Sequence, residues 1–220
     1  MKKRFATTTL AIALTTVTLA FAQAQRGGGA GAPQGGAGAP QGGAAPAGGA
    51  RGPAATPMAL TTTGWMDGAI IPNKFTQAVP MPVSPALTWT NTPMGTQSFV
   101  LHFHDPDVSI TRGTGDQVHW LVWNIPATST GFAEGMPQGA TLPDGSRQIS
   151  ATGQVYRGPG APATGPYHHY TFEIYALDIK LDTVEPGANE QETRTKVMAA
   201  MQGHVLGKAV MFGLFRRPPA

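Results

Sequence analysis

The residues of greatest chemical interest begin in the stretch 102–107, which reads HFHDPD and places two histidines and two aspartates within six positions. Imidazoles and carboxylates can bind a metal ion, act as general acid and base, or hydrogen-bond a small ligand. Three further candidates follow along the chain, namely His119, His168 and Tyr170. Which chemistry they support depends on whether the elements that carry them bring their side chains to one place.

Most of the chain from Met58 onward reads as short strands separated by Pro and Gly turns. One segment, 189–202, instead has helical spacing of apolar residues, with Asn189 and Glu192 as a capping pair, and a last strand is expected over 204–215. The pattern predicts a mainly β domain, a sandwich or barrel with one late helix. The remaining expected strands are rich in aromatic and β-branched residues and cover 87–91, 97–104, 117–124 and 168–178.

The two-residue period of a strand predicts which polar side chains face the core. In the strand 97–104, one face is apolar and leads to Asp105 at the strand's end. His102 and His104 share the opposite face, which we expect to be half exposed.

The other two strands can be read in the same way. His168 and Tyr170 lie on the apolar face of their strand and should point inward, whereas His169 points outward. The strand that carries His119 is apolar on both faces, so His119 should be buried.

Asp105, His119, His168 and Tyr170 can therefore meet at one mouth of the sandwich, because sites are usually built where strands end in loops. Each can also be explained singly, as a strand-end Asp that accepts turn amides, two hydrogen-bonded core histidines and a surface Tyr hydroxyl.

Asp105, His119 and His168 also form the two-His, one-carboxylate ligand set of non-haem iron sites, although no compact H-x-D motif anchors it. The alternatives to ligand binding are thus a metal-dependent or an acid-base enzyme that uses these three residues. A nucleophile lacks support, since Ser109 has no G-x-S-x-G context and Cys is absent.

Three motifs follow one another in the chain, namely DPD at 105–107, HWLVWNIP at 119–126 and YRGPGAPATGPYHHYTFEIYALD at 156–178. In this order they resemble the phosphatidylethanolamine-binding protein (PEBP) family, most closely its bacterial Raf-kinase-inhibitor-like branch. The flanking segments MDGAIIPNKFT at 66–76 and MQGHVLGKAVMFGLFRR at 201–217 extend the resemblance over essentially the whole domain.

This resemblance implies a PEBP-like β-sandwich with a small pocket at one end that binds phosphate, acetate or a phospholipid head group. Two imidazoles, favoured in their charged form, and a Tyr hydroxyl would donate to the anion, while the Asp would accept from a histidine's other nitrogen. Binding should then weaken as the pH rises through the histidines' titration.

We expect no metal and no cofactor. The family's DPD commonly continues with Ala-Pro, where this chain has Val108 and Ser109. The implied ligand-binding residues are Asp105, His119, His168 and Tyr170, with Asp107, Gly158 and Pro159 as candidate wall residues.

The two ends of the chain differ in composition. Residues 1–24 have a basic start, an apolar Thr-rich middle and an A-x-A end, which predicts a signal peptide and an exported protein, periplasmic or secreted, without a transmembrane segment after cleavage. Residues 25–57 are rich in Gly, Ala, Pro and Gln and are expected to form a disordered linker.

The remaining residues 58–220, the expected PEBP-like domain, contain 10 Lys and Arg against 12 Asp and Glu. This net charge of −2 argues against nucleic-acid binding.

Overall fold

The computed structural model describes residues 56–219, and their helices and strands alternate with Pro- and Gly-rich loops. The expected signal peptide and all of the expected linker except Thr56 and Pro57 lie outside the described residues. Within the described part, no helix has both the length and the apolar character that crossing a membrane would need. The elements are β1 (Ala59–Thr62), η1 (Asn73–Phe75), β2 (Leu87–Thr90), β3 (Ser98–Asp105), β4 (Gln117–Pro126), β5 (Gly131–Phe132), β6 (Arg147–Ile149), β7 (His168–Leu177), α1 (Glu190–Ala200) and β8 (Val205–Phe215).

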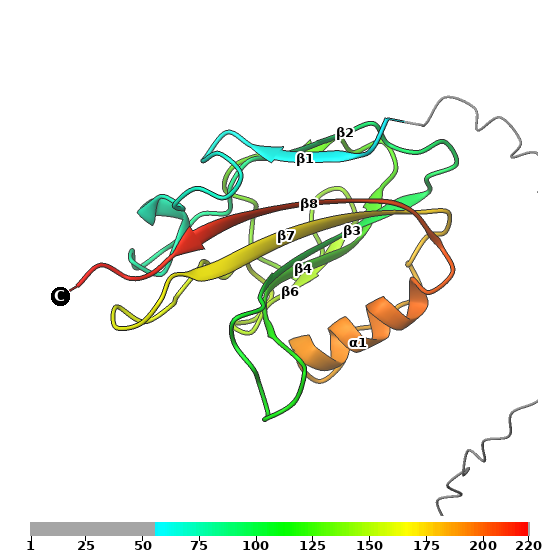
Figure 1. The fold of residues 1–220 in the computed structure, drawn as a ribbon. Coiled ribbons are helices and arrows are strands. Elements are labelled where there is room, and N and C mark those ends of the chain that lie inside the picture. Colours follow the sequence, from blue (N-terminus) through cyan, green and yellow to red (C-terminus); the bar gives the residue numbers. More distant parts are fainter. Residues whose placement is uncertain (1–55, 220) are drawn as a thin grey trace, which may run out of the picture. The chain divides into compact units, whose positions relative to one another are not determined.

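Two antiparallel sheets form the domain, which confirms the predicted β-sandwich. The larger sheet has the strand order β6-β4-β3-β7-β8, and the smaller has the order β1-β2-β5. Figure 1 shows the smaller sheet on one side of the larger sheet and α1 on the other. The core between the sheets contains aromatic side chains such as Trp89, Phe99, Phe103 and Phe172, each at most 1% exposed.

The second face of the larger sheet is buried over β3 and β4, where α1 packs on it, whereas Val210 of β8 is 48% exposed on that face. Val100 and Leu121 of the sheet join Val197 and Met201 of the helical segment in a separate apolar cluster. A sheet covered on both sides needs apolar residues on both faces, which explains the continuous apolar run of β4.

This second layer corrects the expectation that His102 and His104 lie on a half-exposed face. His102 is only 5% exposed, and the side chain of His104 is 12% exposed. The two-residue period predicted the correct face for both residues. It could not show that a helix much later in the chain, Glu190–Ala200, would cover that face.

The helix begins and ends close to the predicted positions. Asn189 caps it, its side chain accepting hydrogen bonds from the backbone N–H groups of Gln191 and Glu192. The carboxylate of Glu192 accepts from the N–H of Ala188 rather than from that of Asn189, so the capping pair differs slightly from the expected box. The helix is followed by Gly203 at φ 82°, a left-handed conformation that glycine adopts without strain.

Differences from the expected strands have local causes. β2 ends one residue early because Asn91 adopts a left-handed conformation with φ 56°. β4 continues past Asn124, another left-handed residue, whose side chain accepts a hydrogen bond from the N–H of Leu181. β1, β5 and β6 were not predicted, because two to four residues are too few to show a period.

Candidate functional site

A cavity of about 160 Å³ opens where β3, β4 and β7 end or begin, and all four predicted ligand-binding residues line it. Asp105 is the last residue of β3, His119 lies near the start of β4, and His168 and Tyr170 lie at the start of β7. Because β3 pairs with both β4 and β7, these strand ends lie at one end of the sheet. The structure has the inward direction predicted for Asp105, His168 and Tyr170 and the burial predicted for His119.

Aromatic rings pack against the pocket residues His119 and Tyr170. The ring of Phe103 stacks on that of Phe172 with 3.8 Å between centroids. The same ring lies 5.3 Å from His119, whose ring stands edge-on to Tyr170 at 5.2 Å. Close-packed rings on adjacent strands hold the two polar rings in defined orientations.

Asp105 holds the ring of His168. The Oδ2 atom of Asp105, a residue only 2% exposed, lies 2.8 Å from Nδ1 of His168. An ionised carboxylate can only accept, so Nδ1 of His168 carries the proton and donates. Oδ1 of Asp105 accepts from the N–H of Asp107 at 3.1 Å. This arrangement leaves Nε2 of His168 as the ring nitrogen available to a ligand.

His119 is held by backbone instead. Its Nδ1 lies 3.0 Å from the carbonyl oxygen of Arg157 and 3.2 Å from that of Gly158, so it must donate to them. Burial lowers the pKa of His119 from 6.5 to about 4. At neutral pH the ring is therefore uncharged, and its remaining nitrogen, Nε2, is an acceptor. This corrects the expectation that both histidines act as charged donors.

The hydroxyl of Tyr170 is also held by backbone groups. Its oxygen accepts hydrogen bonds from the backbone N–H groups of Gly160 at 3.0 Å and Ala161 at 2.8 Å. Burial and the nearby Asp105 carboxylate raise the pKa of Tyr170 well above its usual value. The hydroxyl keeps its proton and can donate it to Asp105 or to a ligand.

The expected wall residues support the pocket without lining it. Asp107 accepts hydrogen bonds from the N–H and from Nδ1 of His169, at 2.6 and 3.0 Å. The carbonyl of Gly158 accepts from His119, and that of Pro159 accepts from the N–H of Gln77 at 2.8 Å. A side chain at position 158 would place its Cβ 2.5 Å from the carbonyl oxygen of Phe75, so only glycine fits there.

Other residues that sequence reasoning missed complete the lining. Arg157 is the only cation among them, and its Nε atom is buried without a partner among residues 56–219. Arg157 lies inside the motif YRGPGAP, but this segment is a loop and has no period that would show a direction. Val108 lines the cavity with an apolar side chain at the position where the chain departs from the family's usual Ala. The further lining residues are Gln77, Gln117, Gly160, Ala161 and Pro162.

The metal alternative is only partly assembled in this pocket. Asp105, Asp107 and His168 offer ligand atoms within 4.8 Å of one another. His119 is not part of this group. The candidate ligands in the pocket are therefore one histidine and two carboxylates, and not the two histidines and one carboxylate of the alternative considered from the sequence.

Comparisons with known proteins agree with this fold and pocket. A family model described as phosphatidylethanolamine-binding protein matches residues 61–216. The UPF0098 protein of Methanothermobacter thermautotrophicus is 41% identical over 162 residues, which cover 73% of this chain and 99% of that protein. The UPF0098 protein YbhB of Escherichia coli is 37% identical over 109 residues, covering 49% of this chain and 67% of that protein.

Solved structures are similar as well. The crystal structure of CT736 of Chlamydia trachomatis, a PEBP homologue, superposes with a TM-score of 0.58 and 30% identity over 72% of this chain and 97% of that chain. That of Escherichia coli YbcL, titled a member of the mammalian PEBP family, has a TM-score of 0.61 and covers 73% of this chain and 99% of its own, but its identity of 23% speaks for the fold alone. From its sequence match, its relatives and its fold, the chain belongs to the phosphatidylethanolamine-binding protein family.

Proposed function

We propose that this protein binds a small anionic group, either phosphate or the phosphate-bearing head group of a phospholipid, in the pocket of Asp105, His119, His168 and Tyr170. The observation that carries the proposal is the convergence of these four side chains, from three strands, on one cavity of about 160 Å³. At roughly 30 Å³ for each water, this space holds about five waters, which suits a phosphate group. Acyl chains of a lipid would have to remain outside.

The hydrogen-bonding pattern favours a ligand that both accepts and donates. Arg157 supplies positive charge at the wall, and the hydroxyl of Tyr170 can donate to an oxyanion. Nε2 of His168 donates as well when the ring carries a proton on both nitrogens, since Nδ1 already donates to Asp105. The neutral His119 presents a lone pair, so it accepts a proton-bearing group of the ligand. Hydrogen phosphate provides a P–OH group for this purpose, and phosphoethanolamine provides an ammonium group.

Calorimetric titration with phosphate, phosphoethanolamine and sulfate tests this proposal. Sulfate has the size of phosphate but carries no proton at neutral pH, so its oxygen would face the lone pair of His119. We expect sulfate to bind roughly tenfold or more weakly than phosphate, because a buried acceptor is then left unpaired. Equal affinities would contradict the role given to His119, and no binding of either phosphate compound would contradict the proposed function.

The pair of Asp105 and His168 supports a second candidate function. A histidine oriented by a buried carboxylate at 2.8 Å is also the arrangement of a general base, so hydrolysis of a phosphate ester is the alternative. The two functions differ in turnover. Release of phosphate from phosphoethanolamine by the wild-type protein, lost in His168→Gln, would support the enzyme, whereas binding without release supports the binding protein.

We further propose that the protein is exported and works outside the cytoplasm. The support is the signal-peptide pattern of residues 1–24, with an expected mature start near Gln23 or Gln25. N-terminal sequencing of the protein from a periplasmic or secreted fraction checks this. A chain in that fraction that still begins at Met1 would contradict it.

A further inference from the structure

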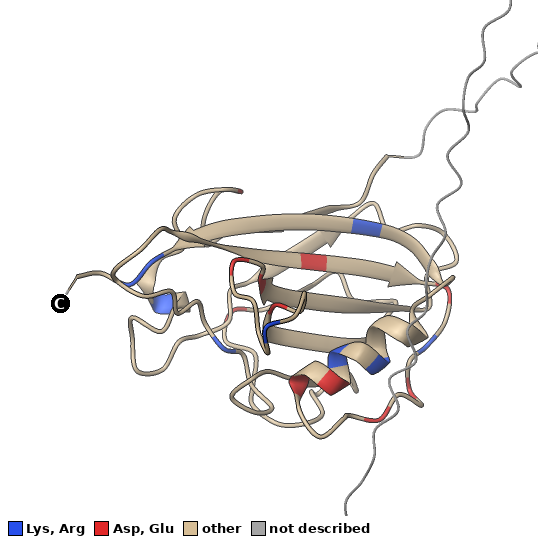
Figure 2. Cartoon of the chain, turned by 60° about the horizontal axis from the view of Figure 1, so that its bottom comes forward, with Lys and Arg blue, Asp and Glu red and all other residues tan. Residues whose placement is uncertain are grey.

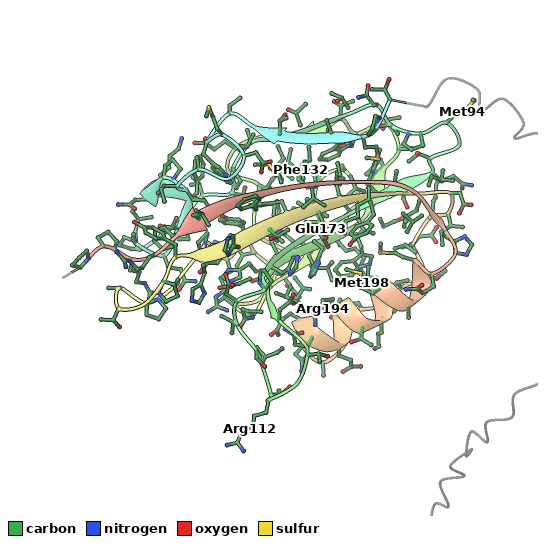
Figure 3. The ribbon with its side chains drawn as sticks, viewed as in Figure 1. Met94, Arg112, Phe132, Glu173, Arg194 and Met198 are labelled. Atoms are coloured by element: carbon green, nitrogen blue, oxygen red, sulfur yellow. The ribbon has the colours of Figure 1, made fainter. Side chains whose placement is uncertain are left out.

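The two histidines of HFHDPD that do not reach the pocket form a second cluster, between the larger sheet and α1. The rings of His102 and His104 stack with 4.3 Å between centroids and 9° between planes. Asp116, at the end of the loop that follows β3, and Glu173 of β7 contact the two rings. Figure 3 shows Glu173 on β7 and Arg194 on α1, the two elements that enclose this cluster.

Each ring has one nitrogen held by a carboxylate and one without a partner. Nδ1 of His104 lies 2.6 Å from Oδ2 of Asp116, and Nδ1 of His102 lies 3.5 Å from Oε2 of Glu173. The Nε2 atoms of both histidines are buried and have no hydrogen-bond partner within residues 56–219. Buried nitrogens without a partner are uncommon, since each costs about 1–3 kcal/mol.

A carboxylate on Nδ1 and a free Nε2 are also what metal-binding histidines show. The carboxylate fixes the tautomer and the ring orientation, and Nε2 is left with a lone pair for the ion. Two such rings side by side indicate a metal site more strongly than one ring alone.

We propose that His102, His104 and Asp116 form a binding site for a divalent transition-metal ion that prefers imidazole ligands, such as Zn²⁺, Ni²⁺ or Cu²⁺. Ligand atoms of the three residues all lie within 4.8 Å of one another. Bonds of about 2.0–2.2 Å around a tetrahedral ion place ligands roughly 3.4 Å apart. Asp116 therefore has to leave Nδ1 of His104, and the three side chains have to rotate toward one another, before they bind one ion. Glu173, with Oε2 3.8 Å from Nε2 of His104, is the nearest further carboxylate.

Two cations already pair with the carboxylates and compete with the metal. Arg194 of α1 donates to Asp116, and Lys208 of β8 donates to Glu173, which also accepts from the hydroxyl of Tyr175 at 2.6 Å. Figure 2 shows the acidic segment of β7 beside the basic segment of β8. Because Arg194 must release Asp116 before that carboxylate binds a metal, removing its charge should strengthen metal binding.

The site is distinct from the anion pocket. His104 and Asp105 are neighbours on β3 and therefore point to opposite faces of the sheet. The pocket face has its own group of candidate ligands, Asp105, Asp107 and His168. An experiment has to separate the two groups.

Calorimetric titration of the purified chain with Zn²⁺ and with Ni²⁺ makes this separation. We expect binding of one ion, weakened at least about tenfold in His102→Gln and His104→Gln and strengthened in Arg194→Gln. His168→Gln, which removes a ligand from the pocket group, and His204→Gln, at a half-exposed histidine, should bind as the wild type does. No binding by the wild type, or binding that is lost in His168→Gln and retained in His104→Gln, would overturn the proposal.

A measurement on the wild-type protein covers the case in which the buried histidine variants fail to fold. Nuclear magnetic resonance of ¹⁵N-labelled histidine rings should show the Nε2 signals of His102 and His104 moving on addition of Zn²⁺, with His204 unchanged. Shifts confined to His168 or to the exposed rings would overturn the assignment.

Discussion

Neutral, buried His119 makes the domain sensitive to acid, and replacing it with Gln should remove a defined part of that sensitivity. Folding lowers the pKa of this ring from 6.5 to about 4. Between these values the unfolded chain binds a proton that the folded chain does not bind, so a falling pH favours unfolding. The stability is intact above about pH 6.5 and falls progressively below it, and the loss is complete below about pH 4.

The size of the effect follows from the shift. The full difference is about 3 kcal/mol, at 1.36 kcal/mol for each pKa unit, and about 2 kcal/mol of it is already lost at about pH 5. Gln cannot titrate but keeps an amide N–H that can donate to the carbonyls of Arg157 and Gly158. His102, whose pKa burial also lowers, is present in both proteins and cancels in the comparison.

Urea unfolding at about pH 7.5 and about pH 5 measures the effect, as the change in unfolding free energy between the two conditions. We expect this change to be about 2 kcal/mol smaller in His119→Gln than in the wild type. His204→Gln, at a half-exposed position, serves as the control and should behave as the wild type does. An equal loss in His119→Gln and wild type would refute the conclusion that His119 is a neutral acceptor.

Three further predictions concern the pocket wall and the linker. Tyr170→Phe leaves the N–H groups of Gly160 and Ala161 without their acceptor, so urea unfolding should show a loss of about 1–3 kcal/mol, and an unchanged stability would contradict this. Arg157→Gln should weaken phosphate binding roughly tenfold or more and reduce its dependence on salt in calorimetry; unaltered affinity would remove Arg157 from the site. Deletion of residues 26–55 should leave the melting temperature unchanged within about two degrees, and a larger drop would mean that this segment packs on the domain.

The pocket was predictable to the extent that local periodicity determines it. Alternation along β3 and β7 is enough to turn Asp105, His168 and Tyr170 inward, because a residue's face in a strand depends only on its neighbours. The meeting of these strands at one end of the sheet depends on their pairing, which the period does not encode. The prediction that these strand ends meet in one pocket came from the resemblance to a known family.

The features that could not be predicted depend on contacts between distant segments. His119 is a neutral acceptor because of two carbonyl oxygens that lie 38 and 39 residues later in the chain. His102 and His104 are buried because α1 packs over their face of the sheet. In both cases the residue types were visible in the sequence, but their charge state or exposure is set by tertiary packing.

Calorimetric titration of three proteins with phosphate, the wild type, His168→Gln and His204→Gln, tests the central claim most directly. His168 lines the cavity and is oriented by Asp105, whereas His204 pairs with Asp178 away from it. The proposed pocket predicts phosphate binding by the wild type and by His204→Gln, with affinity reduced about ten- to a hundredfold in His168→Gln through loss of one charge-assisted hydrogen bond. Equal phosphate affinity in all three proteins would contradict the claim that this pocket binds the anion.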